Sequence, residues 1–170
     1  MEIVTLIENS SKEPQLQAEF GLSLLVRCAG GTILFDMGSS AAFTENAAKL
    51  HVDLEEVDCA VLSHAHYDHG GGLAAFAEVN ATAPVYTAAG ADGDYYGNVG
   101  AKMGPVLHSL VYPIIATNPH FCRYVGLDKE VVSSLKDRHR VVTTRTEILT
   151  NVFLLTQLEK SYPLPEGNKY

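Results

Sequence analysis

Four side chains able to bind a metal ion fall within six consecutive positions of this 170-residue chain. They are His64, His66, Asp68 and His69, spaced as His-x-His-x-Asp-His. Imidazole and carboxylate groups are ligands that zinc and similar divalent ions prefer. We expect His64 and His66 to converge on one ion, with Asp68 and His69 placed to reach a neighbouring ion. The alternative is a histidine-rich surface loop without a role, but scattered histidines rarely show this spacing.

The residues on either side of the cluster predict how it is held. The apolar run Cys59-Ala-Val-Leu-Ser63 comes before it and is typical of a buried strand. Three glycines, Gly70-Gly71-Gly72, come directly after it and allow the backbone to fold tightly. A loop that leaves a buried strand is fixed by the scaffold yet open to solvent on one side. The sequence therefore predicts a metal site on such a loop.

This segment resembles the signature of the metallo-β-lactamase-fold superfamily, a large group of mostly zinc-dependent hydrolases. A second segment, Phe35-Asp36-Met37-Gly38, follows an apolar strand and is similar to that superfamily's earlier Asp-x-Gly motif. The resemblance implies that Asp36 hydrogen-bonds into the loop of residues 64–70, called the metal loop below. Asp36 would orient the ligands on this loop without binding the metal itself. On local sequence alone, Asp36 would be a turn residue before Gly38.

Only the first half of the superfamily's pattern is found here. In that family a further histidine, a bridging aspartate and a final histidine come from the second half of the fold, and no similar motif follows in this chain. The downstream histidines are His108, His120 and His139, and none is expected to be a ligand. His139 lies in a charged segment that predicts a solvated surface. The connection through Tyr95-Tyr96 and Tyr124-Val-Gly-Leu-Asp128 weakly resembles that of the dihydropterin-phosphate-synthase-related members.

The order of predicted elements indicates a layered α/β fold. The resemblance implies the first half of a four-layer αβ/βα sandwich, a mixed sheet covered by helices with the metal site at one edge. Residues 1–170 are expected to form a single domain, truncated before its C-terminal half. The inner face of the sheet should then expose apolar surface, with Val152-Phe-Leu-Leu155 left uncovered. Strands are expected at Glu2–Ile7, Phe20–Cys28, Thr32–Asp36, Cys59–Ser63, Ala83–Thr87, Arg140–Thr144 and Val152–Leu158, and helices at Ala41–Leu50, from Leu73 and at Asp128–Leu135.

Charge and composition exclude several classes of protein. The net charge is −8, and residues 1–100 hold fourteen acidic against three basic residues, which argues against nucleic-acid binding. No apolar run is long enough to cross a membrane, and no secretory signal is visible. Three cysteines without Cys-x-x-Cys spacing favour a reducing cytoplasm. A basic cluster is either a solvated helix end or a feature that attracts an anionic substrate group; it comprises Lys136, Arg138, Arg140 and Arg145.

The resemblance implies a metal-dependent hydrolase that acts on a small-molecule substrate with one or two zinc ions. Zinc activates water at neutral pH, and Asp68, as a ligand, would orient that water or accept its proton. The family cleaves ester, thioester, amide and phosphoester bonds, so the bond stays open. The alternative is a non-catalytic remnant or subunit that binds metal weakly and needs a partner segment, through self-association or a missing C-terminal part.

Overall fold

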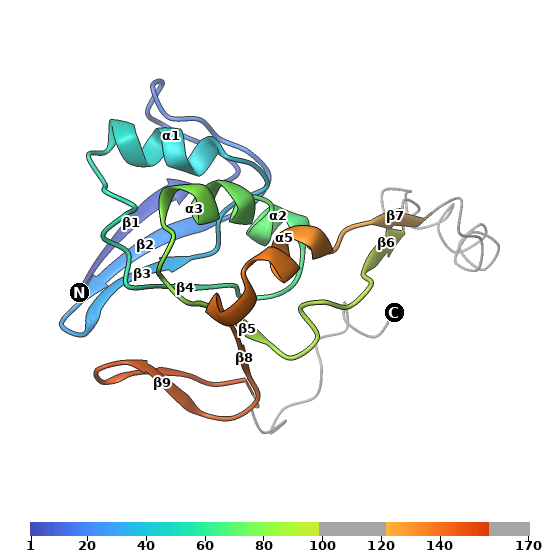
Figure 1. The fold of residues 1–170 in the computed structure, drawn as a ribbon. Helices are drawn as coiled ribbons and strands as arrows, with labels where there is room; N and C mark the ends of the chain where they lie inside the picture. Colours follow the sequence, from blue (N-terminus) through green and yellow to red (C-terminus); the bar gives the residue numbers. More distant parts are fainter. Residues whose placement is uncertain (99–121, 157–170) are drawn as a thin grey trace, which may run out of the picture.

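The structure, a computed structural model, describes residues 1–98 and 122–156. Its centre is a six-stranded mixed sheet with the strand order β1-β2-β3-β4-β5-β8 (Figure 1). The first three strands pair antiparallel, and the last three continue the sheet in parallel. The predicted α/β class is therefore confirmed. The strands are β1 (Glu2–Ile7), β2 (Ser23–Cys28), β3 (Gly31–Phe35), β4 (Cys59–Val61), β5 (Val85–Ala88) and β8 (His139–Val142).

Helices cover one face of this sheet, and a β-hairpin lies against the other (Figure 1). A separate two-stranded ribbon projects from the side of the sheet and helices. None of the helices in the described ranges has the length and apolar character that a bilayer crossing requires. The helices are α1 (Ala42–Lys49), α2 (Tyr67–Gly70), α3 (Leu73–Val79) and α5 (Lys129–Ser134); the hairpin is β9 (Thr146–Leu149) and β10 (Val152–Leu154); the ribbon is β6 (Tyr96–Asn98) and β7 (Cys122–Tyr124).

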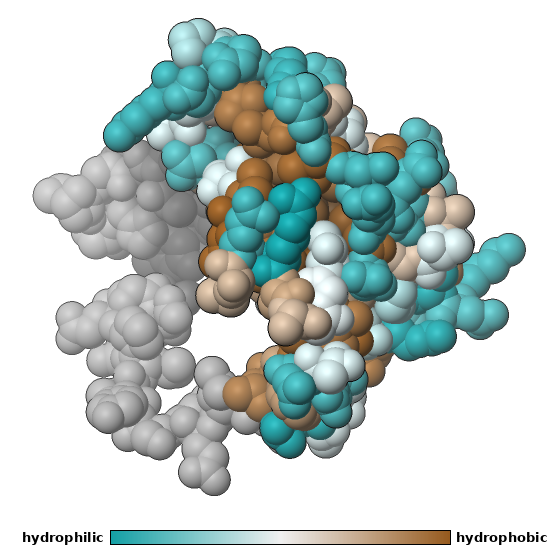
Figure 2. Space-filling model, turned by 90° about the vertical axis from the view of Figure 1, so that its left-hand side faces the viewer, coloured by the Kyte–Doolittle hydropathy of each residue, from teal (hydrophilic) through white to brown (hydrophobic). Residues whose placement is uncertain are grey.

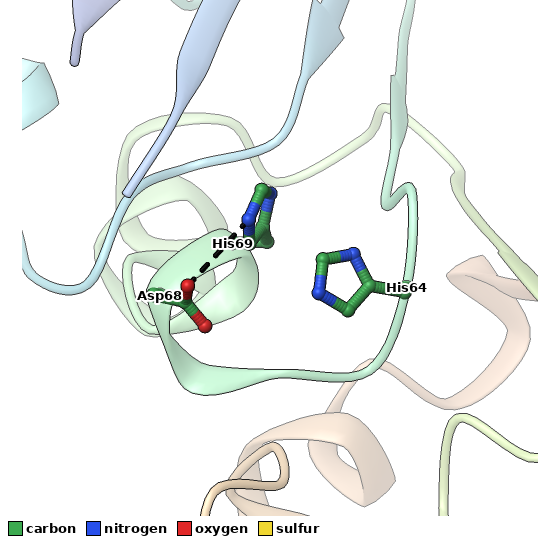
Figure 3. Close-up of side chains that lie close together, drawn as sticks. All are labelled: His64, Asp68 and His69. Carbon is green, nitrogen blue, oxygen red and sulfur yellow. Dashed lines mark ion pairs between the residues drawn. The ribbon is translucent and has the colours of Figure 1, made fainter. Parts of the chain in front are cut away.

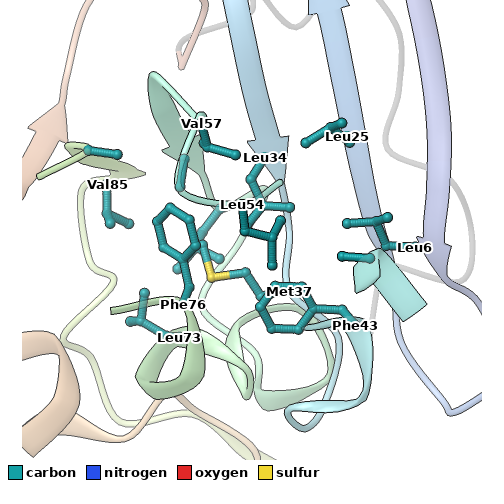
Figure 4. Packing of buried hydrophobic residues seen from close by; sticks show 14 of the residues in the cluster. Leu6, Leu25, Leu34, Met37, Phe43, Leu54, Val57, Leu73, Phe76 and Val85 are labelled. Carbon is teal, nitrogen blue, oxygen red and sulfur yellow. The ribbon is translucent and has the colours of Figure 1, made fainter. Parts of the chain in front are cut away.

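The main core fills the space between the sheet and the helices (Figure 4). Successive strand residues point to opposite faces, so Leu34 of β3 faces the helices while Ile33 and Phe35 face away. Phe43 of α1 and Phe76 of α3 are both 0% exposed and close this core from the helix side. The packing of α1 and α3 on the sheet holds in place the strands from which the metal loop leaves.

The opposite face is not left bare, and here one expectation is only half right. Val152 and Leu154 of the β10 strand pack against Ile33, Cys59 and Val61, so these two residues of the run cover the sheet. The other two residues of the run, Phe153 and Leu155, are uncovered as expected, with exposed fractions of 38% and 59%. Figure 2 shows hydrophobic residues gathered toward the middle of one face of the molecule, with hydrophilic residues along its upper and right edges.

Two strand predictions also need correction. The strand predicted from Phe20 begins only at Ser23, because Gly21 has φ +148° and packs against the metal loop. The strand Thr146–Leu149 was not predicted, and it pairs with β10 to form the hairpin. In contrast, the helix predicted at Asp128–Leu135 is confirmed, and Asp128 caps it, since its carboxylate accepts from two amide groups at the start of α5.

The charged segment before β8 also differs from its prediction. His139, expected on a solvated surface, is half-buried, and its Nε2 lies 2.8 Å from Thr87 Oγ1. Arg138 donates to the carbonyl oxygens of Ala83 and Asn80 at 3.0 and 2.7 Å. Two members of the predicted charged surface therefore hold β8 and its preceding turn in place.

Candidate metal centre

The metal loop leaves the carboxyl end of β4 and turns at once into the single turn of α2. The glycines that follow lie against the segment that leaves β3. A β-carbon built at Gly71 would be 2.4 Å from the Ser39 carbonyl oxygen, and one at Gly72 would be 2.3 Å from that of Met37. Any side chain at these two positions would push the segments apart. The tight folding predicted from the glycines is confirmed.

Asp36 holds the metal loop in place through its buried carboxylate. It is 0% exposed and has φ +57°, a left-handed conformation that Asp tolerates better than most residues. Its carboxylate accepts from the Ser63 amide at 2.8 Å and from the Ser63 hydroxyl at 2.7 Å, and it lies 2.7 Å from His69 Nδ1. The predicted hydrogen bond from Asp36 into the loop is therefore present. A strained, fully bonded buried carboxylate is typical of a functional site.

These contacts fix which ring nitrogens are available to a metal. The carboxylate of Asp36 is acceptor-only when ionised, so His69 Nδ1 donates and its Nε2 lone pair stays free. The one hydroxyl proton of Ser63 is used on Asp36, so His64 Nδ1, 2.9 Å away, donates to Ser63 Oγ. His64 Nε2 is then also free. The sequence reasoning missed Ser63, which directly precedes the motif and was read only as the end of a strand.

The structure brings three of the four predicted ligands into one group. His64, Asp68 and His69 each offer an atom within 4.8 Å of the others, and His69 Nε2 is 3.6 Å from Asp68 Oδ2 (Figure 3). The expected pairing of His64 with His66 is not the closest set. His66 lies beside them, its ring centroid 4.6 Å from that of His64 and 5.8 Å from that of Tyr95.

Two imidazoles and a carboxylate that converge with free lone pairs fit a divalent ion such as zinc. Burial lowers the pKa of His64, and the neighbouring His69 and His66 lower it further. The neutral imidazole is the form that binds a metal, so the shift favours binding. Cys59 on the adjacent strand is no competing ligand, since burial, and then Asp58 beside it, raise the pKa of its thiol to about 12.

Three cavities lie beside the metal loop, and the largest of them is not the one that the predicted ligands line. The largest, 720 Å³, is lined by Tyr67 and α5 and contacts none of the four ligand side chains. A groove of 260 Å³ is lined by Asp68 and His69. A smaller one of 120 Å³ is lined by His64. The groove beside Asp68 and His69 therefore reaches two of the three converging side chains, whereas the largest cavity reaches none of them.

The three histidines downstream of the motif were not expected to be ligands, and the structure describes one of them. His139 is bonded to Thr87, as described above, and does not join the ligand group. His108 and His120 lie outside the described residues.

Three comparisons with known proteins place these residues in context. The sequence profile of the metallo-beta-lactamase superfamily matches residues 16–120. An uncharacterized protein of Methanocaldococcus jannaschii is 35% identical over 71 residues, which cover 42% of this chain and 27% of that protein.

Two solved structures are similar to this chain, and the first of them has the same fold. Tm1679, described as a metal-dependent hydrolase of the beta-lactamase superfamily, is 28% identical with a TM-score of 0.55, over 90% of this chain and 46% of its own. MEM-A1, a subclass B3 metallo-beta-lactamase from a soil metagenome library, is 17% identical with a TM-score of 0.47, over 78% and 44%. The chain thus spans less than half the length of each of these three relatives. The mixed sheet with its helices matches this fold, and the matched parts are consistent with its N-terminal half.

Proposed function

Since this chain belongs to the metallo-beta-lactamase superfamily, we propose that it is a metal-dependent hydrolase of small-molecule substrates. Zinc is the proposed ion, one or two per site, with His64, His66, Asp68 and His69 as ligands. The observation that carries the proposal is the convergence of three of these side chains within 4.8 Å over a buried aspartate. The narrower similarity to dihydropterin-phosphate-synthase-related members stays a prediction.

The reaction needs a polarised scissile bond and an activated water, which a bound zinc ion supplies as a Lewis acid. The chain's own residues hold the geometry around it. Asp36 and Ser63 keep the imidazoles of His64 and His69 in the tautomers that leave Nε2 free. Asp68 is 13% exposed at its side chain, so its carboxylate can orient the attacking water and accept its proton.

Metal content and hydrolysis, measured together, test this proposal. The full chain would be purified, loaded with zinc and analysed for bound metal, then assayed against a generic ester, a thioester and a phosphodiester. Replacing His64→Ala or Asp68→Asn should remove both tight metal binding and hydrolysis. His51→Asn is the matched control, because His51 is an exposed histidine at φ +55° and Asn tolerates that backbone. Hydrolysis that survives both site variants would refute the proposal.

A second candidate follows from how little of its relatives the chain spans. The chain covers 46% of Tm1679, and the ligand group in the described residues has three close members. We therefore keep the proposal that these 170 residues are one part of a domain, completed by a partner segment or by self-association. This candidate predicts that the chain alone binds zinc weakly and does not hydrolyse substrate. Hydrolysis that appears when the complementary part of a relative is added would support it over an independent enzyme. A cytoplasmic location is likewise proposed from the cysteine pattern.

A further inference from the structure

We infer that the groove beside Asp68 and His69 binds an uncharged or cationic, ring-bearing part of the substrate, which packs on Phe20 and is screened against anions by Glu8. This inference rests on the proposed function and names the class of substrate that the site selects. Seven residues line the groove, among them Glu8, Asn9 and Phe20 from the loop between β1 and β2. The sequence pattern places Phe20 in a strand and does not link this loop to the ligands.

The loop is attached to the metal loop at its carboxyl end. The Leu22 amide donates to the Asp68 carbonyl oxygen at 3.3 Å, and the Gly38 amide donates to the Leu22 carbonyl oxygen at 2.8 Å. Gly21 lies so close that a β-carbon there would be 2.2 Å from the Asp68 carbonyl oxygen. The Gly21 amide also donates to Asn9 Oδ1 at 3.0 Å. The wall of the groove is thus fixed to the backbone of a proposed ligand.

Phe20 is held on both sides yet exposed. The Glu19 carboxylate before it accepts from the amides of Ser39 and Ser40 at 2.8 and 3.1 Å, and Gly21 after it is fixed as described. Phe20 itself is 64% exposed. A single exposed apolar side chain is ordinary on a protein surface, but this one stands on a backbone pinned at both neighbours and lines a groove with Asp68. A rigid aromatic ring in that position is suited to pack against a substrate.

The charges of the groove decide what can lie on that ring. Glu8 and Asp68 are its two carboxylates, and no lysine or arginine is among its lining residues. A metal held by Asp68 would offset the charge of that carboxylate, and Glu8 would remain as the other negative charge of the groove. An anionic substituent there would be repelled, whereas an ammonium group would be attracted by Glu8 and by the face of the Phe20 ring. The groove therefore favours neutral and cationic substituents.

The test uses three matched probes, 2-(1-naphthyl)ethylamine, 1-naphthylacetamide and 1-naphthylacetate, which share a ring and differ in charge. Their dissociation constants would be measured on the full chain by amide chemical shifts, before and after zinc is added. In the zinc-free protein we expect the amine to bind about fivefold tighter than the acetate, with the amide between them. The largest shifts should fall on Phe20 and Gly21.

Two variants separate the contribution of the Phe20 ring from that of the Glu8 charge. Phe20→Ala should weaken the amine and the amide by about threefold, and Phe20→Tyr should restore them, since the ring is kept. Glu8→Gln should bring the amine and the acetate to within about twofold of each other while leaving the amide unchanged. Phe153→Ala and Glu56→Gln remove an exposed ring and an exposed carboxylate elsewhere, and they should change nothing.

The outcomes distinguish this inference from the proposed function. Equal affinities for the three probes, a preference for the acetate in zinc-free protein, or no effect of Phe20→Ala would overturn the groove assignment, even in a chain that hydrolyses substrates. The chain could instead bind the amine tightest and the acetate weakest, depend on Phe20 and Glu8 for this order, and show no hydrolysis. That result would support the groove assignment and refute the proposed hydrolase function.

Discussion

The two faces of the central sheet are covered in different ways. On one face, helices α1 and α3 bring Phe43 and Phe76 down onto a continuous core, and both rings are fully buried. On the other face, a single hairpin covers Ile33, Cys59 and Val61, and its own Phe153 stays 38% exposed. The candidate metal centre lies where loops from the densely packed side meet. We conclude that the helix-covered face gives the site its rigidity, while the hairpin face contributes little to it.

The largest expected difference between the faces concerns their aromatic residues. Phe76→Ala should cost about 3–5 kcal/mol of the free energy of unfolding, because it leaves a cavity in a closed core. Phe153→Ala should cost about 1 kcal/mol or less, since the ring is partly exposed and loses mainly its contact with Arg145, whose guanidinium carbon is 3.8 Å from the ring centroid. Urea unfolding of both variants measures this. Similar losses would contradict the distinction between the two faces.

A smaller effect is expected where the packed face ends in a buried carboxylate. Asp36→Asn keeps the left-handed backbone but replaces an acceptor with a donor toward Ser63 and His69, so we expect a loss of about 1–3 kcal/mol in stability. Zinc affinity should fall about 10–100-fold, because the imidazoles lose their orientation. Calorimetric titration with zinc measures the second effect.

Asp58→Asn is the matched control for that variant. Asp58 also accepts an amide hydrogen bond, from Thr32 at 2.7 Å, but it is exposed and belongs to the hairpin side. Its replacement should leave zinc affinity unchanged. An equal loss of zinc affinity in both variants would mean that Asp36 has no special role in holding the ligands.

The smallest effect is a pH dependence at the margin of the packed face. Burial lowers the pKa of His139 from its usual 6.5. The unfolded chain therefore takes up this proton at a higher pH than the folded chain, so stability should decline as the pH falls through about 6.5 and level off below the folded pKa. Unfolding free energies between pH 7.5 and 5.5 should fall less steeply in His139→Gln than in the unchanged chain. An unaltered slope would show that Thr87 and the surrounding atoms do not disfavour the charged form.

The sequence predicted the grouping of ligand-type side chains better than it predicted their surroundings. The cluster from His64 to His69 and the anchor Asp36 could be found because their spacing is short and each follows an apolar strand. The six-residue strand β1 and the capped helix α5 were also predictable from local patterns. Phe20–Leu22 were wrongly assigned to a strand, since the pattern of alternating side chains cannot show that Gly21 packs on Asp68.

By itself, the sequence determined which side chains are available to a metal and that they come from one loop, because ligand type and spacing are local properties. Only the tertiary structure decided how they are arranged. Ser63 and Asp36 select the free nitrogens of His64 and His69, and Glu19 with Gly21 sets Phe20 beside the ligands. Ser63 and His64 are neighbours in the chain, but the other contacts join residues at least 20 positions apart. Hydrogen bonds of that kind form only when packing brings the segments within about 3 Å of each other.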